Sequence, residues 1–209
     1  GIVFMDLNQL DAALNCYKKA LTIKPDYAEA HNNLGATLKE LGQLDGAIKS
    51  YERALAIKPD YAEAHNNLGV TLKELGQLDA AFKRFKKAVA LKPDYADAYA
   101  NLGGVLLDLK RMDEALVSYE RAIAFDPDIN FIFGVLLHTK MHLCIWDDLV
   151  NRLGELTNKI NNGEKVIVPF ALLALIDDPE IQRKNAEIYA NKKHPKSHIL
   201  SKIERYPEH

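Results

Sequence analysis

The sequence has few of the residues that support disulfide or redox chemistry. Its 209 residues include only two cysteines, Cys16 and Cys144, which lie far apart and form no CxxC pair. Chains that bind zinc through sulfur or build a disulfide framework carry cysteines in closely spaced sets. We therefore interpret both cysteines as reduced, buried thiols without a metal or redox role.

Sequence motifs of catalysis are missing as well. No GxGxxG, GxxxxGK or GxSxG pattern occurs in the chain, and these are common fingerprints of nucleotide and acyl-transfer sites. His138 and His142 have a metal-compatible spacing, but they lack the adjoining glutamate of zinc proteases and a third ligand. His194 and His198 are separated by the helix-breaking Pro195. We predict no catalytic residue, no metal and no cofactor in this chain.

Long apolar runs and an excess of one charge are also absent. The longest apolar stretch, 170–176, is far shorter than the roughly 20 residues that cross a bilayer. The opening Gly-Ile-Val-Phe is unlike a signal peptide. The 27 basic residues nearly balance the 29 acidic ones, which does not favour nucleic acid as a partner. We expect a soluble, cytoplasmic protein that binds neither nucleic acid nor membranes.

What the sequence does have is an internal repeat. Segments 28–61 and 62–95 are near-copies, and a proline recurs at intervals of 34 residues. The recurring prolines are Pro25, Pro59, Pro93 and Pro127. Each copy also repeats a set of small and large residues, which in the first copy are Leu34, Gly35, Leu38, Ala47, Tyr51 and Ala54. Such glycines and alanines allow close helix crossings, and an aromatic ring fills the space between layers.

This pattern resembles the tetratricopeptide repeat (TPR), a helix–turn–helix unit of about 34 residues with a proline near its end. Such a unit buries its apolar stripe only when a neighbour stacks on it. The resemblance implies an all-α, right-handed superhelical solenoid, closed here by a C-terminal helical cap. The departure is at the fourth position, usually a bulky aromatic, which is His31, His65 and Tyr99 here.

Turn signals set the expected helix limits within each copy. We predict a first helix over 27–41, ended by a left-handed glycine at Gly42 and, one copy later, at Gly76. An aspartate then stands where an N-cap would begin the second helix. These predicted N-caps are Asp45, Asp79 and Asp113.

The pattern decays after Pro127. In register, Leu137 replaces the repeat glycine, and Trp146-Asp147 stands where a second helix would begin. We divide the chain into a partial TPR, three full repeats, a degenerate repeat and a C-terminal helical extension. Their limits are 1–27, 28–129, 130–161 and 162–209.

The extension carries its own signals. An extended apolar stretch, 166–168, is expected to lead into a short buried helix over 170–176. Asp178 is a predicted cap for a further helix that begins at Pro179, where a missing N–H is harmless, and runs to about Lys193.

The other end is expected to begin inside a repeat. Gly1 falls 34 residues before the first repeat glycine, so the helix over 10–23 would lack its partner helix. The alternative is that this register of Gly1 with Gly35 is chance. Leu14, Tyr17 and Leu21 should then be partly exposed. Because exposed apolar stripes attract partners, we predict either self-association through this end or marked disorder there.

Three asparagines, Asn33, Asn67 and Asn101, occupy the same place in successive first helices. In TPR stacks the first helices line the concave surface, so the three amides should form a row along a groove. A carboxamide has two donors and an acceptor, which can bind the N–H and C=O groups of an extended peptide whatever its side chains. The alternative is that these amides bond to the neighbouring helix.

Residues beside the row complete the predicted peptide-binding set. Asn32 and Asn66 adjoin it, and Glu29, Glu63 and Asp97 lie four residues earlier on the same face. A solvated surface of mixed charge is the alternative interpretation of the flanking carboxylates. TPR clamps for the C-terminal carboxylates of chaperones need a lysine and arginine set on this face, and that set is missing. We predict an extended segment of a protein as the partner.

The segment 136–195 carries a second resemblance. Its stretches KMHLCIWDDLVNRLGEL and VPFALLALIDDPEIQRKNAEIYA are similar to the region that joins the TPR array to the catalytic lobes in bacterial O-linked N-acetylglucosamine transferases and SPINDLY-type proteins. Cys144, Trp146, Pro169 and Leu173 are among the matching positions. Those transferases also have an asparagine row in the TPR groove.

This resemblance implies the substrate-recognition part of a protein O-glycosyltransferase that modifies serine or threonine. The catalytic lobes would lie outside the chain, so the chain itself would not be an enzyme. The alternative is a stand-alone TPR scaffold with no enzyme attached.

Overall fold

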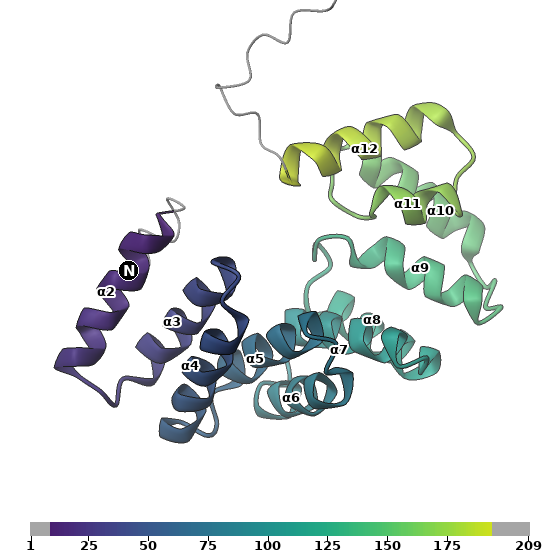
Figure 1. The fold of residues 1–209 in the computed structure, drawn as a ribbon. Helices are drawn as coiled ribbons and strands as arrows, with labels where there is room; N and C mark the ends of the chain where they lie inside the picture. Colours follow the sequence, from purple (N-terminus) through teal and green to yellow (C-terminus); the bar gives the residue numbers. More distant parts are fainter. Residues whose placement is uncertain (1–8, 194–209) are drawn as a thin grey trace, which may run out of the picture. The chain divides into compact units, whose positions relative to one another are not determined.

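The computed structural model describes residues 9–193 and divides the chain into two compact units, 1–127 and 128–209 (Figure 1). Every regular element within the described residues is a helix, which confirms the all-α prediction. In the first unit the helices are α2 (Leu10–Ile23), α3 (Ala28–Glu40), α4 (Leu44–Ile57), α5 (Ala62–Glu74), α6 (Leu78–Leu91), α7 (Ala96–Asp108) and α8 (Met112–Phe125).

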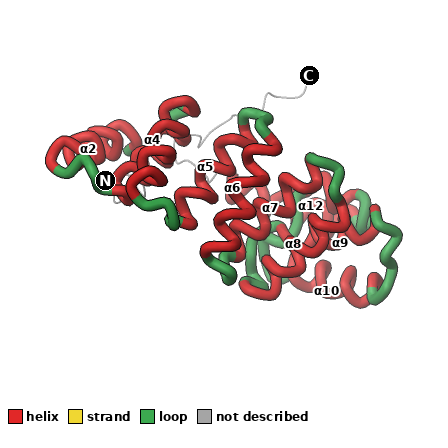
Figure 2. The backbone as a smooth tube through the Cα atoms, turned by 90° about the horizontal axis from the view of Figure 1, so that it is seen from below, coloured by secondary structure: helices red, strands yellow, loops and turns green. Residues whose placement is uncertain are grey.

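The first unit is a stack of antiparallel helix pairs, α3 with α4, α5 with α6 and α7 with α8, each of which also packs on the next pair (Figure 2). The predicted first helix agrees with α3 to within a residue at each end. Gly42 and Gly76 have a φ of +73°, as a left-handed helix stop requires. Lys110 takes the same place in the third repeat with a φ of 63°.

The predicted N-caps of the second helices were wrong. Helix α4 begins at Leu44 and its N-cap is Gln43, so Asp45 is already the second helical residue and makes no capping bond. Asp79 and Asp113 are displaced in the same way. Their carboxylates lie in the first turn, where they interact favourably with the helix dipole.

Close contacts between glycine and an aromatic ring set the distance between paired helices. A Cβ placed on Gly69 would lie 2.7 Å from a ring carbon of the fully buried Phe85. The equivalent pairs, with the same distance, are Gly35 with Tyr51 and Gly103 with Tyr119. The structure therefore confirms the close crossings that the repeat pattern predicts.

At the N-terminal end, α2 packs on α3. Leu14 and Leu21 are half-buried as expected, but Tyr17 is only 7% exposed, so its predicted exposure was wrong. Contact with α3 is enough to cover this ring. The expectation for Gly1 falls outside the described residues, and self-association stays a prediction.

The second unit consists of α9 (Ile132–His142), α10 (Leu149–Asn161), α11 (Pro169–Leu173) and α12 (Pro179–Lys193). Helix α12 packs on α10 and α11, and α11 also contacts α9. The fully or almost fully buried apolar side chains among its described residues are Leu137, Leu156, Ile160, Ile167 and Leu172. No helix of the described residues has the length and apolar character to cross a bilayer.

The degenerate repeat departs from its predicted register. Helix α10 begins at Leu149 and not at Trp146, whose side chain is 53% exposed in the connecting turn. Cys144 and Asp148 both have a positive φ in this connection, which the 34-residue pattern does not predict. Cys144 is exposed and Cys16 is half-buried, so the prediction that both thiols are buried was wrong.

The extended stretch before α11 packs against α9. Val166 and Ile167 are buried, and the N–H of Gly134 on α9 donates to the Val166 carbonyl at 2.9 Å. The following helix is shorter than predicted. It ends at Leu173, and only Leu172 is buried within it, while Phe170 is 86% exposed.

The Asp178 cap is confirmed. Its Oδ1 accepts from the N–H groups of Glu180 and Ile181 at 2.9 and 3.2 Å. We predict that Asp178→Ala destabilises α12 by about 1 kcal/mol, the usual value of an N-cap. Hydrogen exchange of the α12 amides measures this effect. Asp177→Ala removes the same charge from an exposed neighbour, and an equal loss in that variant would contradict the capping role.

Candidate peptide-binding surface

The asparagine row is held together by hydrogen bonds between repeats. Asn67 Nδ2 donates to Asn32 Oδ1 at 3.0 Å, and Asn101 Nδ2 donates to Asn66 Oδ1 at 2.9 Å. These bonds join α3 to α5 and α5 to α7, which are neighbouring helices. The bond to the neighbouring helix that we considered as the alternative is therefore present.

The two kinds of asparagine differ in burial. Asn32 and Asn66 are 6% exposed, and their oxygens accept from the next repeat. Asn33, Asn67 and Asn101 are half-buried. Since a carboxamide carries two N–H donors and an oxygen with two lone pairs, one bond to a neighbour does not exhaust Asn67 or Asn101.

Two of the three predicted flanking carboxylates take part in ion pairs. Glu29 lies 3.8 Å from Lys58, and Glu63 lies 3.6 Å from Lys92. Asp97 is exposed, and Asp126 stands at the position that lysine occupies in the earlier repeats. The same lysines lie over tyrosine rings, Lys58 over Tyr61 and Lys92 over Tyr95, each at 4.8 Å.

A second set of ion pairs joins the far ends of the first helices. Lys39 lies 3.7 Å from Glu74, and Lys73 lies 3.3 Å from Asp108. Exposed pairs of this kind contribute little to stability. Their effect is to make the border of the row a surface of mixed charge, without a dominant positive or negative potential.

The predicted histidine pair, His138 and His142, lies in α9. The rings of His138 and His142 meet edge to face at 4.4 Å. Burial, and secondarily the nearby His142, lowers the pKa of His138. Within residues 9–193 no group of three metal-binding side chains gathers in one place.

Comparison with known proteins identifies the repeats. Models described as TPR repeat match residues 1–42, 37–76 and 71–110, and a tetratricopeptide repeat model matches 96–129. The chain belongs to the tetratricopeptide repeat family. No curated protein sequence matches it significantly.

Solved structures share the TPR solenoid at low sequence identity. PilF of Pseudomonas aeruginosa is 22% identical with a TM-score of 0.74, over 94% of this chain and 90% of that chain. MamA is 23% identical with a TM-score of 0.63, over 91% and 94%. The first TPR of Spaghetti (RPAP3), bound to the HSP90 peptide SRMEEVD, is 25% identical with a TM-score of 0.54, over 56% and 93%. These structures support the helical TPR fold of a protein-interaction module.

The asparagine row was predictable from the sequence, but its hydrogen bonds between repeats were not. The donor in one repeat and the acceptor in the preceding repeat are 35 residues apart, one more than the period. The signal was present in the doublets Asn32-Asn33 and Asn66-Asn67, in which the first residue is buried and accepts from the next repeat, and the second is half-buried.

Proposed function

We propose that the first unit binds an extended segment of a partner protein along the row Asn33, Asn67 and Asn101 in a concave groove. The observation that carries the proposal is the bonding of Asn67 and Asn101 to the preceding repeat. An amide fixed by one bond loses less conformational entropy when it binds a ligand with its remaining groups. Such a row contacts peptide N–H and C=O groups, and so it accepts many sequences.

The other predicted residues have supporting roles in this proposal. Asn32 and Asn66 hold the row in place from below, since they are buried. Glu29, Glu63 and Asp97 flank it, and the lysines paired with the first two keep the border nearly neutral. The RPAP3 module, with its HSP90 peptide, supports a peptide as the class of ligand. The lysines that border this face are paired with its own carboxylates, so we infer an internal segment, and not a C-terminal carboxylate, as the ligand.

We predict that replacing Asn33, Asn67 and Asn101 together by alanine weakens peptide binding tenfold or more. Each lost hydrogen bond contributes about 0.5 to 1.5 kcal/mol, and the three losses add if the sites are independent. Unrelated peptides should be affected alike. Fluorescence anisotropy with a panel of extended peptides containing serine or threonine measures this effect.

The hydrogen bonds between repeats require a stability control. Asn67→Ala leaves the buried Asn32 oxygen without its donor, which costs about 1 kcal/mol of folding free energy. Asn33→Ala breaks no bond to a preceding repeat among the described residues, but it removes the oxygen that accepts from the buried Asn32 Nδ2 at 3.3 Å, so its melting temperature must be measured as well. Asn158→Ala, on the exposed side of α10, should change nothing. Unchanged affinity in the triple variant, measured well below its melting temperature, would rule out the groove function.

We further propose that the module selects acceptor proteins for a cytoplasmic O-glycosyltransferase of the O-linked N-acetylglucosamine transferase and SPINDLY type. The support is the resemblance of 136–195, together with the asparagine row. The coding sequence downstream of His209 decides between this proposal and the stand-alone scaffold. Some 300 further residues with nucleotide-sugar lobes favour the transferase, and an early stop codon favours the scaffold.

A further inference from the structure

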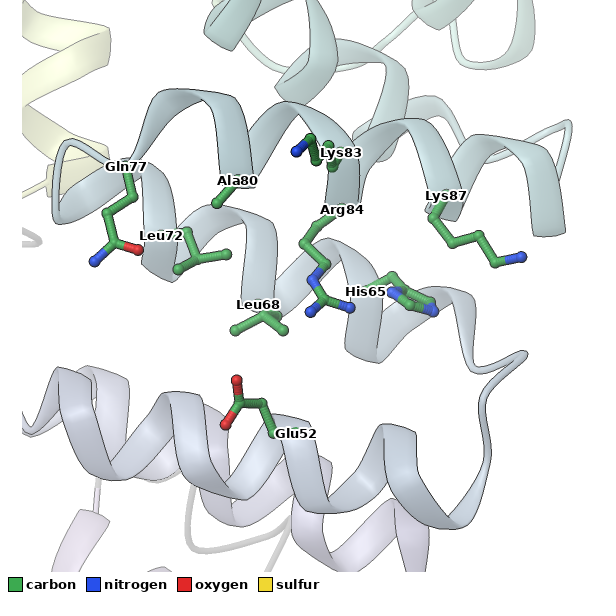
Figure 3. A pocket seen from close by; sticks show the side chains of 9 residues that line it. All are labelled: Glu52, His65, Leu68, Leu72, Gln77, Ala80, Lys83, Arg84 and Lys87. Carbon is green, nitrogen blue, oxygen red and sulfur yellow. The ribbon is translucent and has the colours of Figure 1, made fainter.

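A cleft of about 510 Å³ lies on the first unit between α4 and α6, with α5 as its floor (Figure 3). Leu68 and Leu72 of α5 provide an apolar base. Arg84 and Lys87 of α6 form one wall, and Glu52 of α4 stands on the other. The cleft therefore has an apolar floor between a cationic wall and a single carboxylate.

The cationic wall is particular to the second repeat. Helix α6 carries four cations, Lys83, Arg84, Lys86 and Lys87, against one acid, Asp79. Serine stands at the position of Arg84 in both flanking repeats, as Ser50 and Ser118, and each hydroxyl donates to a carbonyl of its own helix. The repeat pattern therefore does not require an arginine at this position.

The cations of this wall have no carboxylate partner among the described residues. In the first repeat Arg53, which corresponds to Lys87, pairs with Asp26 at 3.2 Å. In the third repeat Arg111 pairs with Glu114 at 2.6 Å and stacks on Phe82. By contrast, no described residue pairs with Lys83, Arg84 or Lys87 in this way. Their charge is left for solvent or for an external anion.

A buried histidine at the end of the cleft also has one ring nitrogen without a hydrogen-bond partner. His65 is 6% exposed, and its Nε2 lies 3.0 Å from the carbonyl oxygen of Pro59. Because a carbonyl only accepts, Nε2 carries the proton, and Nδ1 is an acceptor without any bond. Figure 3 draws this ring beside the guanidinium of Arg84. An unsatisfied buried nitrogen costs free energy that a bound ligand can recover.

We propose that this cleft is a second binding site, which takes an acidic peptide segment with an apolar side chain next to its carboxylates. A carboxylate would lie against Arg84 and Lys87, where arginine can bind both oxygens. The neighbouring apolar side chain would cover Leu68 and Leu72. The glutamate wall at Glu52 fixes the direction of the segment, since it repels carboxylates from that side.

This site is separate from the asparagine row. His65 and Asn67 are two residues apart on α5, so their side chains point about 200° apart around the helix axis. Leu68 and Leu72 lie on the same face of α5 as His65, toward the cleft. Glu63 and Glu74 lie on the opposite face, with Asn67. One module can therefore hold two segments at once, and loss of one site leaves the other intact.

Binding of an acidic peptide in the cleft should favour protonation of His65. Burial lowers the pKa of His65, the bond to Pro59 opposes this, and the charges of Arg84 and Lys87 lower the pKa further. The imidazole is thus neutral at pH 7.5. A bound carboxylate offsets the cations and raises the pKa, so that binding takes up a proton at Nδ1. Affinity should increase as the pH falls from 7.5 to 6, where aspartate and glutamate stay ionised.

The test uses the full chain and a fluorescent eight-residue peptide that contains leucine between glutamates, at low salt. We expect Arg84→Ser to weaken binding about tenfold and to leave folding intact, since serine is native at this place in both flanking repeats. Lys86→Glu is the matched control. Glutamate is native at this position in both flanking repeats, as Glu52 and Glu120. Lys86→Glu changes the net charge by two units, against one for Arg84→Ser, but Lys86 does not line the cleft. We expect less than a threefold effect from it.

His65→Gln tests the buried nitrogen. The glutamine amide can still donate to Pro59, but it does not titrate, so the gain in affinity between pH 7.5 and 6 should disappear. The proposal is overturned if the acidic peptide fails to bind or if Lys86→Glu weakens binding as much as Arg84→Ser. Tighter binding of a single-stranded oligonucleotide than of the peptide would also overturn it, because the ligand class would then be wrong.

Discussion

Replacing Gly134 by alanine should destabilise the second unit by about 3 kcal/mol, near the upper end of the usual cost of overpacking. A Cβ at this position would lie within the side chain of Ile167, 2.5 Å from its Cδ1. Ile167 is fully buried, and its chain is held to α9 because the Gly134 N–H donates to Val166. The isoleucine therefore has no free space to move into, and α9 must separate from the extended stretch.

Gly154→Ala is the matched control for this change. Gly154 lies in α10 of the same unit, has nothing within 4 Å of an added Cβ, and has no positive φ. This substitution should stabilise α10 by about 0.5 to 1 kcal/mol, the difference in helix propensity. Hydrogen exchange of α9 and α10 amides reports both effects. Equal protection in the two variants would show that the Gly134 contact is not tight.

The first unit was predictable because the same contacts and turns recur in each repeat. The contact between glycine and an aromatic ring, seen at Gly69 and Phe85, recurs in all three full copies, and a left-handed glycine ends the first helix in two of them, at Gly42 and Gly76. The N-caps failed because a capping aspartate and an aspartate in the first turn differ by only two residues. Both positions favour a carboxylate, for bonding and for dipole reasons respectively.

The second unit was less predictable because its decisive contacts do not follow the period. Register arithmetic placed Leu137 at the repeat glycine, but the close approach is made at Gly134 by Ile167. That residue lies in the extension that follows the helix pair, and no repeat pattern refers to it. Likewise the positive φ at Cys144 and Asp148 delays α10 beyond Trp146, and neither residue type signals it.

In the candidate sites, too, the features that follow the repeat were predictable and the others were not. Asn33, Asn67 and Asn101 were found because they recur, whereas their bonds to Asn32 and Asn66 depend on how one repeat is offset from the next. Arg84 was missed because it is an exception to the pattern. Departures from the repeat are therefore the better guide to a specific function of one repeat, and agreements are the better guide to the fold.

Gly69→Ala should destabilise the first unit by about 2 kcal/mol, despite the better helix propensity of alanine. The added Cβ would lie 2.7 Å from the ring of Phe85, which is fully buried and cannot rotate away. A repeat in the middle of a stack supports both neighbours, so its loss uncouples the helices on either side. Exchange protection should fall in α5 and α6 first, and then in α4 and α7.

Two variants show whether the ring is the cause. Gly46→Ala adds the same methyl group to α4 at an ordinary contact distance of 3.4 Å from Leu38, and alanine is native at the equivalent Ala80. It should be neutral or slightly stabilising. Phe85→Leu removes the clashing ring atoms, so the double variant with Gly69→Ala should be more stable than the sum of the single effects, by about 1 kcal/mol or more. If the effects of the two substitutions on the free energy of unfolding simply add, the distance between α5 and α6 is set by other contacts. The recurring glycine would then be explained by backbone conformation and not by the space that the ring requires.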